Sequence, residues 1–133
     1  MIYNSLQRAS FSYYLFGVFY FMTHYVYRLS VGRHTYYGRT ENPDRRILAH
    51  RLTIVRLVNL PEGMFKPDSL NFHNKAARFL RQKKCKVSKG CTPYFSSCIC
   101  YQSECLDDVK DVELYLIHKS AKNKFCHNVK TTK

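Results

Sequence analysis

Short extended runs alternate with helical patterns along this chain. Two runs, at residues 25–31 and 35–38, are rich in tyrosine and valine, and Gly32 between them suits a tight turn. A third run of the same kind covers residues 94–101. We therefore predict three short strands, of which the first two form a hairpin.

Three further segments place apolar side chains at helical spacing. They cover residues 43 to about 58, 69–84, and 106 to about 120. Asn42 is the expected cap of the first helix, with Pro43 at its first position, and Asp107 or Asp108 is the expected cap of the third. The predicted order is strand, strand, helix, helix, strand, helix. This order indicates a small α/β layer fold with a three-stranded, mostly antiparallel sheet flanked by helices.

The length of 133 residues indicates one domain, preceded by an apolar extension at residues 1–24. Within that extension, Phe11 to Met22 is an uncharged run of twelve residues. A membrane span needs about 20 residues, so we expect this run to be an element that covers the sheet edge. A role as a signal peptide or in membrane association stays open.

The net charge of +13 is the strongest feature of the composition and implies an anionic partner, such as nucleic acid or a membrane surface. Basic residues concentrate at 75–89, where a solvated helix face is the simplest explanation. Most of the acidic residues fall in the short stretch 104–113. Carboxylates held together in a basic protein indicate a possible metal site.

The six cysteines show no pair with the spacing of a zinc knuckle. Cys98 and Cys100 would point to one face of a strand, which favours burial. We expect reduced thiols packed as small apolar residues, in a protein of the cytoplasm or nucleus. A secreted protein with a disulfide framework is the alternative.

Several side chains in the first half of the chain suit phosphodiester chemistry. Arg46 and His50 stand four residues apart and so share a helix face, and Tyr36 ends the strand before that helix. Tyr27 is on the paired strand, but whether it shares a face with Tyr36 depends on the turn. Glu113 falls among apolar residues of the third helix, where it either sits at a solvated edge or is paired or metal-bound.

The order of these residues resembles the GIY-YIG nuclease family over about residues 25–128. Tyr-Val-Tyr at 25–27 is similar to the first family motif, and Tyr-Tyr-Gly at 36–38 is similar to the second. Arg46 and His50 then follow on a helix, Glu113 opens a Glu-x-x-x-Ile helix, and Asn128 lies near the end. The chain departs from the family at Tyr25, where glycine is usual, and at Tyr37, where isoleucine or valine is usual.

The resemblance implies a metal-dependent DNA endonuclease. By this resemblance, Tyr36 would be the general base, helped by Tyr27 or His50. A phenol needs nearby positive charge to act near neutral pH, and Arg39, Arg45 and Arg46 would supply it. Arg46 would clamp the phosphate, and Glu113 would hold one divalent ion, Mg²⁺ or Mn²⁺. Gly38 and Asn128 would support the site.

The implied partner is DNA, contacted through its phosphates without reading of sequence. The expected contacts are Arg33, Arg39, Arg45, Lys83, Lys84, Lys86 and Lys89. Specificity would come from DNA shape, from extra length at 53–71, or from a protein partner, and repair, recombination, viral or mobile-element roles all fit. Residues 129–133 form a basic tail. The alternative function is a nucleic-acid-binding module on the same fold that does not cleave.

Overall fold

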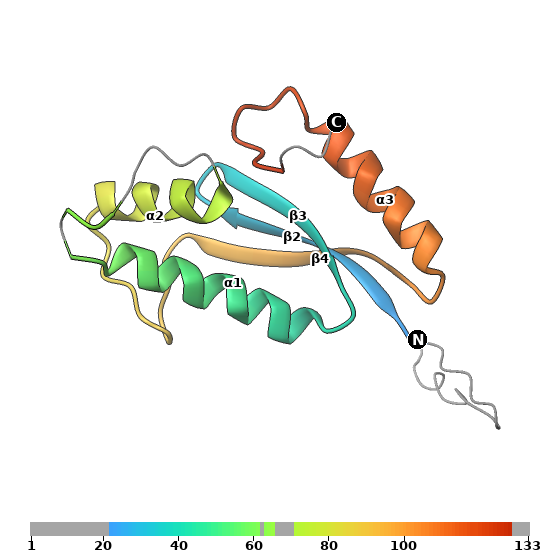
Figure 1. Ribbon diagram of the computed structural model, residues 1–133, viewed down its shortest axis with the longest axis horizontal. Coiled ribbons are helices and arrows are strands. Elements are labelled where there is room, and N and C mark those ends of the chain that lie inside the picture. Colours follow the sequence, from blue (N-terminus) through green and yellow to red (C-terminus); the bar gives the residue numbers. More distant parts are fainter. Residues whose placement is uncertain (1–21, 62, 66–70, 129–133) are drawn as a thin grey trace.

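The computed structural model describes residues 22–61, 63–65 and 71–128. Along the chain these residues form β2 (His24–Val31), β3 (His34–Thr40), α1 (Pro43–Val58), α2 (Phe72–Gln82), β4 (Phe95–Ser103) and α3 (Leu106–Lys119), as Figure 1 shows. The predicted order of elements is confirmed. Most of the apolar run Phe11 to Met22 and the tail 129–133 lie outside the described residues. None of the described helices is long and apolar enough to cross a membrane.

The three strands form an antiparallel sheet in the order β3-β2-β4, which confirms the predicted hairpin. Gly32, at the hairpin turn, has a φ of 60°, a conformation that glycine adopts readily. In the hairpin register Tyr27 pairs with Gly38 and Leu29 pairs with Tyr36. Because side chains alternate between faces, Tyr27 and Tyr36 lie on the same face of the sheet.

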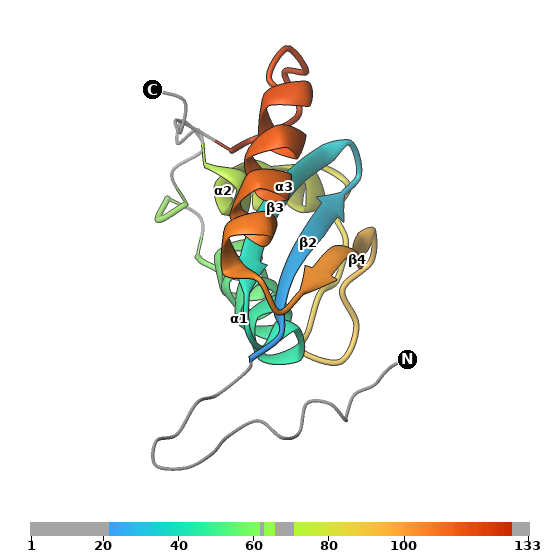
Figure 2. The ribbon, with the colours of Figure 1, turned by 90° about the vertical axis from the view of Figure 1, so that its right-hand side faces the viewer.

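The main core lies between this face of the sheet and the helices α1 and α2. Tyr27, Leu29 and Val31 point into it from the central strand, and they are at most 1% exposed. α1 and α2 add Ile54, Val58, Phe72, Ala76, Ala77 and Leu80. The helix α3 contacts all three strands, and Figure 2, viewed from the α3 side, shows α3 in front and α2 behind it. The core therefore fixes the position of β2 relative to both α1 and α2.

The ends of the first two helices follow local hydrogen bonding. The Asn42 side chain accepts from the backbone N–H of Arg45, and Pro43 occupies the first position of α1, as predicted. α2 begins at Phe72, where the Asn71 side chain caps it by accepting from the Asn74 N–H at 2.9 Å, and Ser69, the predicted start, lies outside the described residues. The first six residues of the stretch 53–71 continue α1 without interruption.

The predicted cap of α3 is wrong. Neither Asp107 nor Asp108 caps the helix, since both lie in its first turn, and the capping position belongs to Cys105, whose side chain makes no capping bond. The backbone is still extended at Cys105, with a φ of −91° and a ψ of 107°. The two carboxylates instead lie near the positive end of the helix dipole, where negative charge is favourable.

The expected burial of Cys98 and Cys100 is also wrong. β4 is an edge strand, and both thiols are exposed on it, with Cys98 opposite the exposed Arg28. Partial desolvation by the surrounding residues, followed by the neighbouring Cys98, nevertheless raises the pKa of the Cys100 thiol to about 11. All six cysteines are free thiols in the structure, so the disulfide framework finds no support. Cys85 alone packs against the main core as expected.

Candidate active site

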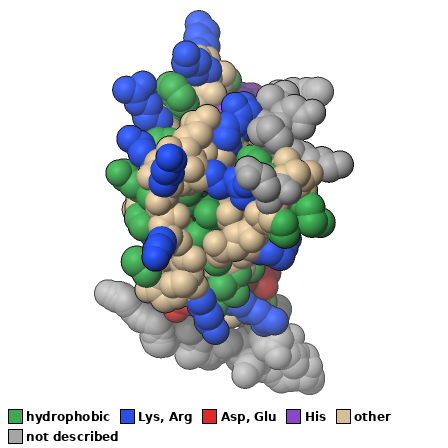
Figure 3. All heavy atoms as spheres, turned by 90° about the vertical axis from the view of Figure 1, so that its left-hand side faces the viewer, with side chains coloured by type: hydrophobic (Ala, Val, Ile, Leu, Met, Phe, Trp, Pro, Cys, Tyr) green, Lys and Arg blue, Asp and Glu red, His purple; other side chains and the backbone are tan. Residues whose placement is uncertain are grey.

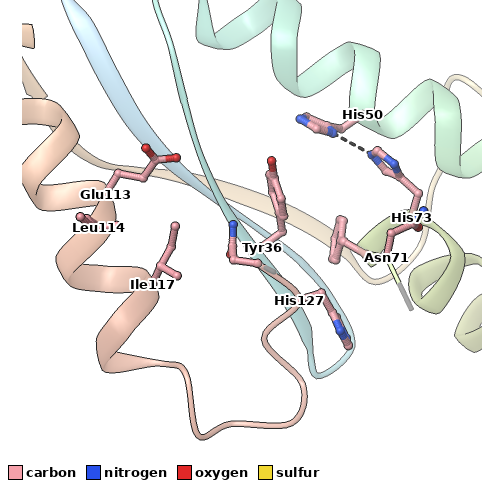
Figure 4. Close-up of a pocket in the computed structure, with 10 residues that line it drawn as sticks. Tyr36, His50, Asn71, His73, Glu113, Leu114, Ile117 and His127 are labelled. Carbon is pink, nitrogen blue, oxygen red and sulfur yellow. Dashed lines mark hydrogen bonds between the residues drawn. The ribbon is translucent and has the colours of Figure 1, made fainter. Parts of the chain in front are cut away.

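A pocket of about 560 Å³ opens between β3, the start of α2 and α3. Figure 4 shows the Tyr36 hydroxyl in this pocket, between the Glu113 carboxylate and the His50 ring. The pocket is lined by Tyr36, His50, Asn71, Phe72, His73, Glu113, Leu114, Ile117, His127 and Asn128. Four of the residues singled out from the sequence therefore line one pocket, although they come from separate parts of the chain.

A chain of hydrogen bonds runs beneath the pocket. The Tyr27 hydroxyl lies 2.8 Å from His50 Nε2, and His50 Nδ1 lies 2.8 Å from His73 Nε2. The rings of Tyr27 and Tyr36 both pack against His50, with centroid distances of 5.7 and 5.4 Å. Tyr27 is only 1% exposed and does not line the pocket, so Tyr36 is the phenol that a bound molecule would meet.

Gly38 leaves the space that Tyr27 occupies. A Cβ atom built on Gly38 would collide with the ring and the hydroxyl of Tyr27, its partner across the hairpin. Any other residue at this position would therefore push the phenol away from His50. This contact gives a physical reason for the glycine that ends the second tyrosine-rich run.

The Glu113 carboxylate is partly buried and paired. Its side chain is 21% exposed, and its Oε1 accepts a hydrogen bond from Arg39 Nε at 3.2 Å. Among the described residues, no group of three or more His, Cys, Asp or Glu could hold a metal ion, so the acidic residues of 104–113 do not form such a cluster. Mg²⁺ is usually bound by one or two carboxylates together with water and substrate phosphate. A single carboxylate beside an open pocket fits that kind of site.

Both phenols are harder to ionise than a free tyrosine. Burial, followed by the neighbouring Tyr36, raises the pKa of Tyr27 to about 12, although Arg46 acts in the opposite direction through a hydrogen bond and its charge. Burial and then the Glu113 carboxylate raise the pKa of Tyr36, and Arg46 only partly offsets them. In the free protein, therefore, Arg46 does not bring the pKa of Tyr36 below that of a free tyrosine. Arg39 is paired with Glu113.

The histidines of the site are held neutral. Burial, then His73 and Arg46, lower the pKa of His50 to about 4, and burial and Arg56 lower the pKa of His73. A second pair lies at the other end of the pocket wall, where His34 Nδ1 is 2.9 Å from His127 Nε2 and the two rings stack. Burial and His34 lower the pKa of His127 to about 4.

The segment after α3 is fastened along the outer edge of β3. The Asn128 side chain accepts from the Tyr37 N–H and donates to the Tyr37 carbonyl, both at 2.7 Å. Thr35 exchanges two backbone hydrogen bonds with Phe125 and His127. Asn128 therefore supports the pocket wall by holding the strand that carries Tyr36.

Sequence reasoning missed His73 and His127. His73 had a usable signal, since it precedes Ala76, Ala77 and Leu80 by three, four and seven residues and so shares their buried helix face. His127 had no comparable signal, because its position depends on a loop that folds back on β3. Its contact with His34 joins residues 93 positions apart in the sequence.

The predicted phosphate-contacting residues fall into two groups. Arg39, Arg45 and Arg46 are exposed at the end of β3 and the start of α1, next to the site. Lys83, Lys84, Lys86 and Lys89 are exposed in the connection after α2, at the other end of the molecule in Figure 1, and Arg33 lies over the Phe125 ring. Figure 3 shows many Lys and Arg side chains and few acidic ones on the face that includes this end. The structure does not bring the second group to the pocket.

The chain matches no protein-family model, no curated protein and no solved structure. The fold and the side-chain geometry are therefore the observations on which a function can be argued.

Proposed function

We propose that this chain is a metal-dependent endonuclease that hydrolyses phosphodiester bonds in DNA. The observation that carries the proposal is the convergence of a phenol, a guanidinium and a carboxylate, from Tyr36, Arg46 and Glu113. Tyr36 and Glu113 line one pocket, Arg46 lines a second pocket together with Arg39, and the charges of both Glu113 and Arg46 act on the pKa of Tyr36. The net charge of +13 supports a polyanionic substrate.

Arg46 would bind the scissile phosphate. It is exposed in the first turn of α1, and its planar guanidinium can donate to two phosphate oxygens at once. The charge that develops on the phosphate during attack would be stabilised by these donors. Arg45, beside it and also exposed, would contact a neighbouring phosphate.

Tyr36 would take the proton from the attacking water. The water O–H bond breaks, its proton moves to the Tyr36 phenolate oxygen, a new P–O bond forms, and the bond to the leaving 3′ oxygen breaks with its electron pair. Because the pKa of Tyr36 is raised above 10, only a small fraction is ionised at neutral pH. The cleavage rate should therefore increase with pH across the neutral range.

Glu113 would hold Mg²⁺ or Mn²⁺. Such an ion would polarise the phosphate and offset the carboxylate charge that opposes ionisation of Tyr36. Arg39, which donates to the same carboxylate, would be free to contact DNA once the ion is bound.

The alternative is a binding module that does not cleave, and one observation favours it: neither phenol ionises readily in the free protein. The test is nicking of supercoiled plasmid and of a flapped duplex with Mg²⁺ or Mn²⁺, between pH 7 and pH 9. We expect metal-dependent nicking, abolished by a chelator, that increases about tenfold per pH unit, as the ionised fraction of a high-pKa group does. DNA binding without nicking of either substrate would support the binding module instead.

A further inference from the structure

The chemistry of the side chains in the hydrogen-bonded chain under the pocket determines which group donates and which accepts in each bond. Arg46, on α1, interacts with the Tyr27 hydroxyl, which contacts His50, which in turn contacts His73 at the start of α2. A guanidinium can donate hydrogen bonds but cannot accept them. The Tyr27 O–H therefore cannot use Arg46 as its acceptor.

Burial then leaves one arrangement. Tyr27 is 1% exposed, and a buried hydroxyl hydrogen that lacks an acceptor is costly. Among the contacts of this hydroxyl in the described residues, His50 Nε2 is the acceptor within hydrogen-bonding distance. His50 must then carry its proton on Nδ1 and donate it to Nε2 of His73, which in turn carries its own proton on Nδ1.

We propose that His73 is a positioning residue of the site: by accepting the Nδ1–H of His50, it fixes the tautomer of His50 and turns the lone pairs of Tyr27 toward Arg46. The effect on catalysis rests on the proposed function, because it acts through the arginine that would bind phosphate. The tautomer itself does not depend on any activity.

The surroundings keep His73 in its accepting form. Burial, followed by the positive charge of Arg56 on α1, lowers the pKa of His73 and keeps the ring neutral. His73 is also the second residue of α2, where the helix dipole disfavours a cation. The other titratable groups of the pocket are Tyr36 on β3, Glu113 on α3 and His127 after α3.

Loss of the acceptor should allow the chain to reverse. In His73→Phe the Nδ1–H of His50 has no partner, so this tautomer loses its advantage over the other one, in which Nε2–H donates to the Tyr27 oxygen, and both should be populated. That oxygen then faces two donors, His50 and Arg46, and its own hydrogen has no acceptor. His73→Gln offers a side-chain carbonyl oxygen in place of Nε2 and should keep the original direction.

The test is ¹⁵N nuclear magnetic resonance of the histidine rings in the full chain at pH 7.5. We expect His50 to be protonated on Nδ1 in the wild type and in His73→Gln, and at least partly on Nε2 in His73→Phe. Protonation on Nε2 in the wild type would overturn the proposal, whether or not His73→Phe folds. An unchanged His50 tautomer in a folded His73→Phe would overturn it as well.

Cleavage adds a second measurement. If the chain is a nuclease, His73→Phe should lower the single-turnover nicking rate about tenfold, as is common for residues that orient a catalytic group, and His73→Gln should restore most of it. Equal rates in His73→Phe and the wild type would contradict a positioning role in catalysis. If His73→Phe changes the tautomer of His50 but the wild type never nicks DNA, the nuclease proposal is refuted and the assignment of His73 stands.

Discussion

The inner and outer halves of the candidate site differ in charge. In the inner half, Tyr27, His50 and His73 are hydrogen-bonded to one another and all three resist ionisation. In the outer half, Arg39 and Glu113 form a partly exposed ion pair. Neutral groups can be buried at low cost when they are paired, whereas ionised groups need solvent or a charged partner. The comparison indicates that the inner half sets geometry and the outer half supplies charge.

The largest effect should follow from removing Arg46, whose positive charge acts on Tyr27, Tyr36 and His50. Arg46→Ala should reduce single-turnover plasmid nicking about 100-fold or more, the usual cost of losing a group that stabilises transition-state charge. DNA affinity should change little, since one phosphate contact among several is lost. Nicking within threefold of the wild type would remove Arg46 from the mechanism.

A smaller effect should follow from adding side-chain volume next to the inner half without changing its charge. Gly38→Ala inserts a methyl group against the Tyr27 ring, and overpacking of this kind costs about 1–3 kcal/mol of unfolding free energy. Gly90→Ala is the matched control, because a Cβ there meets nothing within 4 Å. Urea denaturation of both variants makes the comparison. Equal stability of the two would mean that the tyrosine moves aside freely.

The smallest effect should come from acid, which charges the neutral histidines. The pKa values of His50 and His127 are about 4 in the folded chain, against about 6.5 when unfolded, so the unfolded chain binds protons first as pH decreases. Their contribution to stability is complete above about pH 6.5 and is lost toward pH 4. The melting temperature should therefore decrease over this range. The decrease should be smaller in His127→Gln than in the control His118→Gln, since His118 is exposed on α3. A melting temperature independent of pH would contradict neutral, buried pairs.

Much of the fold could be predicted because its signals are local. The tyrosine-rich strands, the turn at Gly32 and the cap at Asn42 depend on residues within a few positions of one another. The errors arose where a distant element decides the outcome. Cys98 and Cys100 have a pattern suited to burial, yet they are exposed because their strand lies at the sheet edge.

The candidate site could be predicted in part for the same reason. Arg46 and His50 share a face of α1 by simple helical spacing. The burial of Tyr27, in contrast, depends on Gly38 across the hairpin and on α1. Its consequence, a raised rather than a lowered pKa, could not be read from the arginines nearby in the sequence. The residue types therefore indicated which side chains could take part in the chemistry. The packing around Tyr27 determined its pKa.

The most direct test of the central claim is single-turnover nicking by Glu113→Gln beside Asp111→Asn, with Mg²⁺ at pH 8. Both variants remove one carboxylate charge from α3, but Glu113 lines the pocket and Asp111 is exposed. The account predicts that Glu113→Gln binds DNA yet nicks at least about 100-fold more slowly, while Asp111→Asn matches the wild type. Equal nicking by the two variants would contradict the account.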